Sequence, residues 1–349
     1  MHAKLFVPLA CRTALSLAPA PRRALVRRMS SRNPVLDHLT TEELFQFDLN
    51  GYVIVRGALN AAEIADIHTA IDAHVGEAIS RSPPQLRNAK EESAFGAKGS
   101  RRDLGGMLGW EEDCFRKLIA HPKLAKYVTA MCGEGYRLDH QPLVLIQDKA
   151  SEGFSLHGGP ISGEDGQSAG VFNPELQYRC VNGQPWSSLL AMSVHIVDAP
   201  EDAGGFCVVK GSHKLNFPVP AHYAAGGDLD FAKEHVYQPQ TKAGDVIFFS
   251  EATVHGALPW RQDYERRLAL FRFAPANFGY GRAYLNEWGA GTLDRCTPAQ
   301  RAVLQPPFAA RLERDVSTAL GDSGPPPEKK KRMQSKKDHD RAVFGSDFF

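Results

Sequence analysis

The chain has 349 residues, with 41 lysines and arginines against 40 aspartates and glutamates and a formal net charge of +1 at pH 7. This balance excludes the strong overall field typical of proteins that bind nucleic acid or anionic membranes, so charge is informative only locally. The six cysteines include no Cys-x-x-Cys pair, which argues against a zinc or disulfide framework, and no apolar run reaches the ~18 residues that a membrane span requires.

Both ends of the chain differ in composition from its middle. The first 33 residues contain basic side chains and no acidic one, so we predict that residues 1–36 are a transit peptide, with a merely disordered basic leader as the alternative. Because arginine exceeds serine there, a mitochondrial destination is favoured over a plastid, and a protein that is not imported would be cytoplasmic. Residues 311–349 combine a Pro-rich break with a basic cluster and predict a solvated tail, with a nuclear signal or a polyanion contact as the alternative.

Residues 37–310 are predicted to form one domain that begins with helices. Thr40 and Glu43 have the spacing of a capping box, which predicts a helix that ends before Gly51, followed by a strand over 52–55. Asn60 and Glu63 repeat the capping pattern at the start of a second helix, whose apolar stripe predicts packing on a sheet. Residues 111–133 are predicted to form a third helical region.

The pattern then changes to short strands separated by Gly, Pro and Asp turns. Strands are predicted within 142–149, 187–198, 204–212, 243–250 and 266–274. This texture indicates a sheet sandwich or barrel rather than alternating βαβ units, and a double-sheeted jelly roll fits it best. The predicted fold class is therefore mostly β with flanking helices (α+β).

Polar residues at the ends of these strands are the candidates for chemistry. His157 and His255 lie at strand ends, where barrel mouths collect ligands, and Arg266 follows His255 by eleven residues, a distance that a hairpin could close. Taken singly, each has a structural explanation, as a hydrogen-bonded histidine or a solvent-paired arginine. Their order, however, is the layout of a non-haem iron and 2-oxoglutarate site.

Three segments carry a family resemblance. Residues 44–64 ("LFQFDLNGYVIVRGALNAAEI"), 197–218 ("VDAPEDAGGFCVVKGSHKLNFP") and the strands that hold His255 and Arg266 resemble the phytanoyl-CoA dioxygenase family, with the match running from about residue 39 to about residue 275. The resemblance implies a double-stranded β-helix in which His157 and His255 bind iron(II) and Arg266 binds the distal carboxylate of 2-oxoglutarate. It also implies an O2-dependent enzyme that oxidises an unactivated C–H bond of an acyl, lipid-like or other small-metabolite substrate.

The family pattern fails two residues after His157. Hydroxylating members have His-x-Asp, whereas the matching residue here is Gly159, and Ala257 stands where relatives often carry a hydroxyl. In the first interpretation, which we favour from sequence, Gly159 leaves a metal position open for chloride or bromide, as in the halogenases of this superfamily, or for water.

Two other interpretations remain open. A hydroxylase could use water or another acid, with Glu164 and Asp165 in a Gly-rich segment as candidates, and His195 could point into the barrel or be a core histidine. A non-catalytic jelly-roll binding module is the third interpretation. Residues 160–187, with Phe172, Tyr178 and Trp186, are expected either to line the substrate entrance or simply to pack.

Overall fold

The computed structural model describes residues 39–80, 92–162, 171–226, 228–280, 288, 291–307, 338 and 341–342. All of them belong to one compact unit, Asn33–Phe349. The predicted transit peptide (1–36) lies outside the described residues, as does most of the predicted tail (311–349), so both stay predictions. Within the described part, no helix combines the length and the apolar character that crossing a membrane would require.

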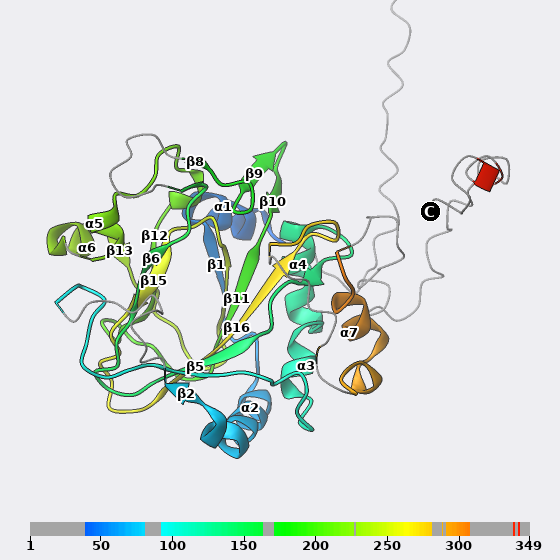
Figure 1. Ribbon diagram of the computed structural model, residues 1–349, viewed down its shortest axis with the longest axis horizontal. Helices are drawn as coiled ribbons and strands as arrows, with labels where there is room; N and C mark the ends of the chain where they lie inside the picture. The colour runs from blue at the N-terminus through cyan, green and yellow to red at the C-terminus, as the bar shows by residue number, and fades with distance from the viewer. Residues whose placement is uncertain are drawn as a thin grey trace, which may run out of the picture. The chain divides into compact units, whose positions relative to one another are not determined.

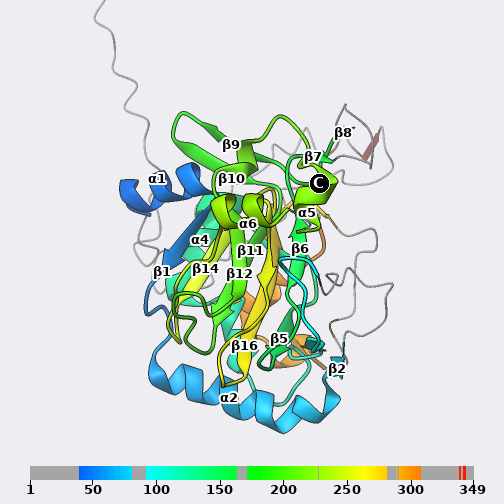
Figure 2. The same ribbon diagram turned by 90° about the vertical axis from the view of Figure 1, so that its left-hand side faces the viewer.

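The N-terminal elements follow the predicted capping signals. Helix α1 (Thr41–Asn50) starts with a complete capping box between Thr40 and Glu43 and ends at Gly51, whose φ of 81° is left-handed. Strand β1 (Tyr52–Val55) follows directly. Helix α2 (Ala61–His74) has the same capping box between Asn60 and Glu63, continues as the 3-10 turn η1 (Val75–Glu77), and lies across the end of the sheets at the bottom of Figures 1 and 2.

Two antiparallel sheets form the centre of the fold. The large sheet has the order β1, β14 (Val246–Ser250), β11 (Leu190–His195), β16 (Arg266–Ala274), β5 (Leu143–Gln147), β3 (Arg102–Leu104) and β2 (Ile79–Ser80), with β4 (Arg137–Leu138) also paired to β16. The small sheet has the order β13 (Val236–Tyr237), β12 (Gly205–Val209), β15 (His255–Leu258) and β6 (Phe154–His157). The sheets face each other in Figure 1, which confirms the predicted jelly-roll fold.

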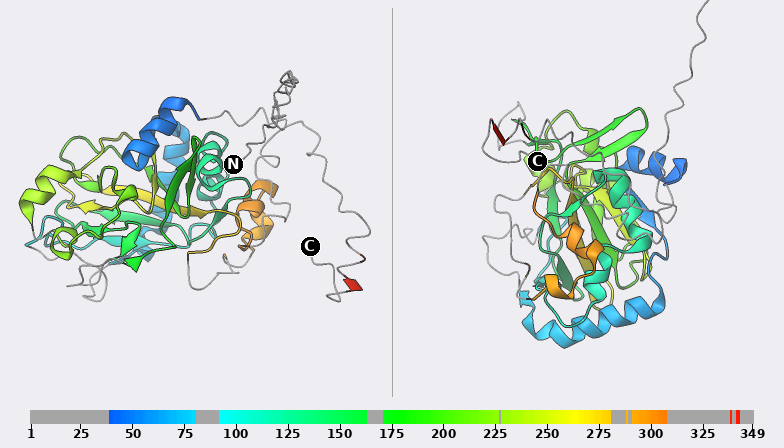
Figure 3. Two further views of the ribbon diagram at one scale, coloured as in Figure 1. Left: turned by 90° about the horizontal axis from the view of Figure 1, so that it is seen from above. Right: turned by 90° about the vertical axis from the view of Figure 1, so that its right-hand side faces the viewer.

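Helices cover the outer face of the large sheet. α3 (Cys114–Leu118), α4 (Pro122–Cys132) and α7 (Pro298–Val303) lie on the side opposite the small sheet, as Figure 1 and the right-hand view of Figure 3 show. Pro122 starts α4 and so divides the predicted third helical region in two. Ala269, Phe271 and Phe273 of β16 belong to the main core under these helices.

The other face of the large sheet points into the lumen between the two sheets. Side chains alternate along a strand, so Arg266, Leu268, Leu270 and Arg272 lie on the face opposite to that of Phe271. An apolar cluster fills part of this lumen; its buried members are Tyr52, Ala191, Phe206, Val208, Ile247 and Phe249. The polar side chains that share the lumen face are therefore placed in an apolar, water-poor surrounding.

Smaller elements complete the fold. They are the hairpins β7 (Ile161–Ser162) with β8 (Val171–Phe172) and β9 (Tyr178–Val181) with β10 (Gln184–Ser187), the helices α5 (Ala221–Ala224) and α6 (Leu229–His235), and the 3-10 turns η2 (Ser212–Lys214) and η3 (Leu293–Arg295). Tyr178 donates to Asp48 at 2.7 Å and packs on Phe47 of α1. Of the two expectations for this residue, the contacts of Tyr178 match packing.

Candidate active site

His157 and His255 lie side by side across two neighbouring strands. His157 is the last residue of β6 and His255 the first of β15, and the antiparallel register pairs the two residues directly. Directly paired residues present their side chains to the same face of a sheet, and the two imidazole centroids are 4.1 Å apart. The fold thus brings together the two histidines that the sequence proposed as metal ligands.

Both imidazoles are held in the same way. Nδ1 of His157 is 3.0 Å from the carbonyl oxygen of Ser155, and Nδ1 of His255 is 2.7 Å from that of Thr253. A carbonyl can only accept, so each Nδ1 is the protonated nitrogen and each Nε2 keeps its lone pair, the form in which histidine binds a metal. Burial, together with the neighbouring His255, lowers the pKa of His157 to about 3, and burial also lowers the pKa of His255. Both rings are therefore neutral at pH 7.

Residues 211–213 (Gly-Ser-His) support the turn that precedes His255. The Ser212 hydroxyl accepts the backbone N–H of Val254 at 2.7 Å, and His213 reaches the carbonyl oxygen of Asp48 at the end of α1. Gly51 must be glycine here, because a Cβ would lie 2.4 Å from the Thr253 hydroxyl oxygen. Three segments that are distant in the sequence therefore converge on the turn before His255.

The position of Arg266 corrects one expectation. Residues 255–266 do not form a hairpin, because β15 pairs with β12 and β6 in the small sheet whereas β16 belongs to the large sheet. The connection between them crosses from one sheet to the other and is anchored by the fully buried Trp260. Arg266 therefore reaches the lumen from the opposite sheet and not as a strand neighbour of His255.

The guanidinium of Arg266 is buried and oriented. Its Nη1 donates to Oε1 of Gln147, whose Nε2 in turn donates to the carbonyl oxygen of Glu152 at 2.7 Å. A Cβ at Gly205 would lie 2.6 Å from Arg266 Nε, so this glycine leaves the room that the side chain occupies. Burial and then the nearby Arg101 lower the pKa of Arg266 to about 9. Among the described residues no carboxylate contacts it.

Two further buried polar atoms share this end of the lumen. His195 Nε2 and Ser193 Oγ have no hydrogen-bond partner in the described part of the chain. They lie opposite Leu268 and Leu270 of β16, on the lumen face that carries Arg266. Burial, and next the charge of Arg266, lowers the pKa of His195 to about 3. A guanidinium without a carboxylate partner, beside polar atoms without hydrogen bonds, fits a bound carboxylate such as the distal one of 2-oxoglutarate.

Comparison with known proteins identifies the family. The profile of the family described as Phytanoyl-CoA dioxygenase (PhyH) matches residues 47–268. The chain belongs to this phytanoyl-CoA dioxygenase family. Its members are 2-oxoglutarate-dependent dioxygenases, so the chain is an enzyme of that family, and the predicted cofactors iron(II) and 2-oxoglutarate are the family's own. No curated protein matches the chain.

Solved structures agree on the fold. HygX from Streptomyces hygroscopicus, in a crystal structure with nickel, 2-oxoglutarate and hygromycin B, is 22% identical with a TM-score of 0.56, over 70% of this chain and 90% of that one. The iron-bound crystal structure of HygX is 21% identical with a TM-score of 0.56, over 73% of this chain and 95% of that one. At this level of identity the likeness shows the fold alone.

Gly159, the departure from the pattern of the phytanoyl-CoA dioxygenase family, has a conformational cause. Gly158 and Gly159 have φ of 95° and 94°, values that other residues rarely adopt. A Cβ at Gly158 would also lie 2.6 Å from the carbonyl oxygen of Thr253 and 2.8 Å from that of Glu251. The segment after His157 thus packs closely against the turn before His255. At Gly159 the positive φ favours glycine, while a Cβ there would make only ordinary contacts, with Val254 Cγ2 at 3.5 Å and the Ile161 carbonyl oxygen at 3.7 Å.

Glu251 is the site residue that sequence reasoning missed. It is 5% exposed, and its Oε2 is 3.6 Å from Nε2 of His255, while its Oε1 accepts from Nε of Arg272 at 2.6 Å. Burial raises the pKa of Glu251, but the charge of Arg272 and its hydrogen bond outweigh burial and hold the pKa at about 2. The signal in the sequence was an acid four residues before a ligand histidine, within one turn.

The structure places only some of the other predicted candidates. Glu164 and Asp165 lie outside the described residues. His195 bonds to Thr241 Oγ1 at 2.7 Å and lies near Arg266, apart from the histidine pair. Ala257 pairs with Phe206 beside the apolar part of the lumen, and Ser193 and His195 carry polar atoms without a hydrogen bond on the lumen face of the large sheet.

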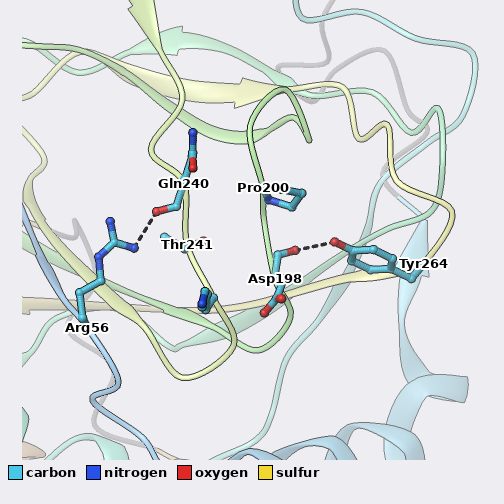
Figure 4. A pocket seen from close by; sticks show the side chains of 7 residues that line it. Arg56, Asp198, Pro200, Gln240, Thr241 and Tyr264 are labelled. Carbon is cyan, nitrogen blue, oxygen red and sulfur yellow. Dashed lines mark hydrogen bonds between the residues drawn. The ribbon is translucent and has the colours of Figure 1, made fainter.

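A separate surface pocket lies behind His195. Figure 4 shows its lining, in which Arg56 donates to the Gln240 carbonyl and the Tyr264 hydroxyl donates to that of Asp198. Its other lining residues are Pro200, Thr241 and Lys242. None of the residues that contact the histidine pair lines it, so this pocket is distinct from the candidate active site.

Proposed function

We propose that this chain is an iron(II)- and 2-oxoglutarate-dependent oxygenase that hydroxylates an unactivated C–H bond. The observation that carries the proposal is the pairing of His157 and His255, with both Nε2 lone pairs free, in the same lumen as the buried and carboxylate-free Arg266. Two neutral imidazoles are suitable ligands for iron(II), and the planar guanidinium of Arg266 can donate two parallel hydrogen bonds to a carboxylate.

Each residue has a defined task in this proposal. His157 and His255 hold the metal, and Arg266, oriented by Gln147, binds the distal carboxylate of 2-oxoglutarate. When bound, iron and 2-oxoglutarate supply the power to activate O2 and to oxidise a C–H bond. The apolar lumen excludes water from the reacting groups. The family name supports an acyl, lipid-like or other small-metabolite substrate.

Halogenation is the second candidate, and Gly159 is the observation that favours it. In that reaction chloride or bromide would take the position that an acid at 159 fills in hydroxylating relatives. We rank hydroxylation first because the ionised Glu251 lies beside His255, where a halide would meet a like charge. The positive φ of Gly159 also favours glycine whether or not a halide binds.

An anaerobic titration tests the metal and co-substrate assignment. Iron(II) added to the protein with 2-oxoglutarate should produce a visible charge-transfer band, and His157→Ala and His255→Ala should abolish it. His235→Ala, which removes an exposed histidine of α6, is the matched control and should leave the band intact. A wild type without a band would support the non-catalytic binding module instead.

The dependence of turnover on halide distinguishes hydroxylation from halogenation. In halide-free buffer the proposed hydroxylase should consume 2-oxoglutarate as fast as in chloride or bromide. Metabolite profiles of cells that lack the protein should then lack one or more hydroxylated products, identified by mass, and should retain all halogenated metabolites. Turnover that requires halide would make halogenation the function.

A further inference from the structure

The turn before His255 carries the carboxylate of Glu251. Within the described ranges, His157, Glu251 and His255 form a group whose ligand atoms all lie within 4.8 Å of one another. Octahedral bonds of ~2.1 Å place adjacent ligand atoms ~3 Å apart, and Glu251 Oε2 is already 3.6 Å from His255 Nε2. Only a small adjustment separates this arrangement from two histidines and one acid on one metal.

The glutamate is held so that one oxygen stays available. Arg272 engages Oε1, and the backbone N–H of Glu251 donates to the Leu189 carbonyl oxygen at 3.0 Å, which anchors the turn on the large sheet. Oε2 faces His255. Carboxylates that bind metals are commonly fixed by a hydrogen bond to the oxygen that does not bind, which is the position of Arg272 here.

The segment after His157 is in close contact with the turn that carries Glu251. The backbone at Gly158 lies so close to the carbonyl oxygens of Glu251 and Thr253 that a Cβ would overlap them. The segment that would carry an acid after His157 is thus packed against the turn that carries Glu251. At Gly159 itself a Cβ would meet only Val254 Cγ2 at 3.5 Å and the Ile161 carbonyl oxygen at 3.7 Å.

From this geometry we infer that Glu251 is the third protein ligand of the iron, in place of the acid that relatives carry two residues after the first histidine. Arg272 is a positioning residue that orients it. The inference rests on the proposed function, since it concerns the metal held by the same two histidines. It gives this chain a complete set of two histidines and one carboxylate, assembled from a different position in the sequence.

The test measures metal binding without turnover. Manganese(II) is titrated into the protein, and the EPR signal of the free ion reports the bound fraction. Glu251→Gln keeps the shape and can still accept a hydrogen bond from Arg272, so the fold should persist while the metal affinity falls more than ~100-fold, beyond the ~10–100-fold effect of residues that only orient a ligand. Glu265→Gln, which removes a partly buried acid paired with Arg102 and Arg267, is the matched control and should change nothing.

The positioning role of Arg272 is tested with separate variants. Arg272→Gln should weaken manganese binding by ~10–100-fold, and Arg272→Lys should recover part of the loss because it keeps the charge. Arg267→Gln, on the opposite face of β16, is the control. If Glu251→Gln fails to fold, the double variant Glu251→Gln/Arg272→Gln leaves no unpaired charge and is tested in its place.

The outcomes separate this inference from the proposed function. Manganese affinity in Glu251→Gln equal to that of Glu265→Gln, with binding lost in His157→Ala and His255→Ala, overturns the role of Glu251 and leaves the proposed function standing. Retained binding in both histidine variants overturns the proposed function itself. Loss in all three variants, with the controls unchanged, supports both.

Discussion

Replacing Arg266 by lysine tests the co-substrate pocket. The arginine is 2% exposed, and its guanidinium can offer a carboxylate two parallel N–H donors while Gln147 holds Nη1 in place. Lysine keeps the positive charge but presents a point donor, which must be shared between Gln147 and the ligand. The variant should therefore bind 2-oxoglutarate less tightly and leave substrate affinity unchanged.

The expected size of this effect follows from the lost hydrogen bond. A hydrogen bond to a charged group contributes about 1.5–3 kcal/mol, which corresponds to about 10- to 150-fold weaker binding of 2-oxoglutarate. Titration of the charge-transfer band at fixed iron(II) measures this affinity directly, and the apparent KM for 2-oxoglutarate measures it in turnover. Arg267→Lys is the control, because Arg267 lies on the outer face of β16 and pairs with Asp72 and Glu265 at 2.6 Å each.

One pattern of results would refute this reasoning. If Arg266→Lys binds 2-oxoglutarate as wild type does and instead loses affinity for the substrate, the buried arginine serves the substrate and the co-substrate pocket lies elsewhere. An equal loss in Arg267→Lys would show a general effect of changing charge on this strand, and would remove the case for a specific contact.

Three other predictions concern the loop after His157, acid stability and targeting. Gly159→Asp should lower the free energy of unfolding by about 1–3 kcal/mol because φ is 94° there, and Gly158→Ala should cost more because its Cβ also meets the backbone; chemical denaturation showing no loss in either would contradict this account. Burial raises the pKa of Asp139, but His140 and Arg137 outweigh it and lower the pKa to about 2. A carboxylate whose pKa is depressed in the folded state stabilises the fold fully at pH values above its ordinary pKa of 3.8. The ~2 kcal/mol advantage over Asp139→Asn should therefore shrink as the pH falls from about 5 to about 2, and an advantage independent of pH would argue against the pairing. We also propose that residues 1–36 direct import into mitochondria; a fluorescent protein carrying them should reach that organelle, and one that stays cytosolic would rule this out.

Local and periodic features of the fold could be predicted from the sequence. The capping boxes at Thr40 and Asn60 involve residues only three positions apart, so their geometry follows from the chain itself. The strand at 266–274 was predicted with the bounds that β16 has, because its apolar pattern and flanking turns are local as well. The order of His157, His255 and Arg266 along the chain also indicated the kind of site, since ligand types and their order can be read without coordinates.

Tertiary structure decided how these residues meet. The eleven residues between His255 and Arg266 matched a hairpin by length, yet the pairing of β15 with β12 and β6 places them in different sheets. No role was assigned to Glu251 from the sequence, and only the approach of Arg272 from β16 of the same sheet and of His157 from β6 of the small sheet makes it part of the metal group. These contacts join segments up to about a hundred residues apart, and no local propensity or period encodes them, because they depend on how two sheets close over one lumen.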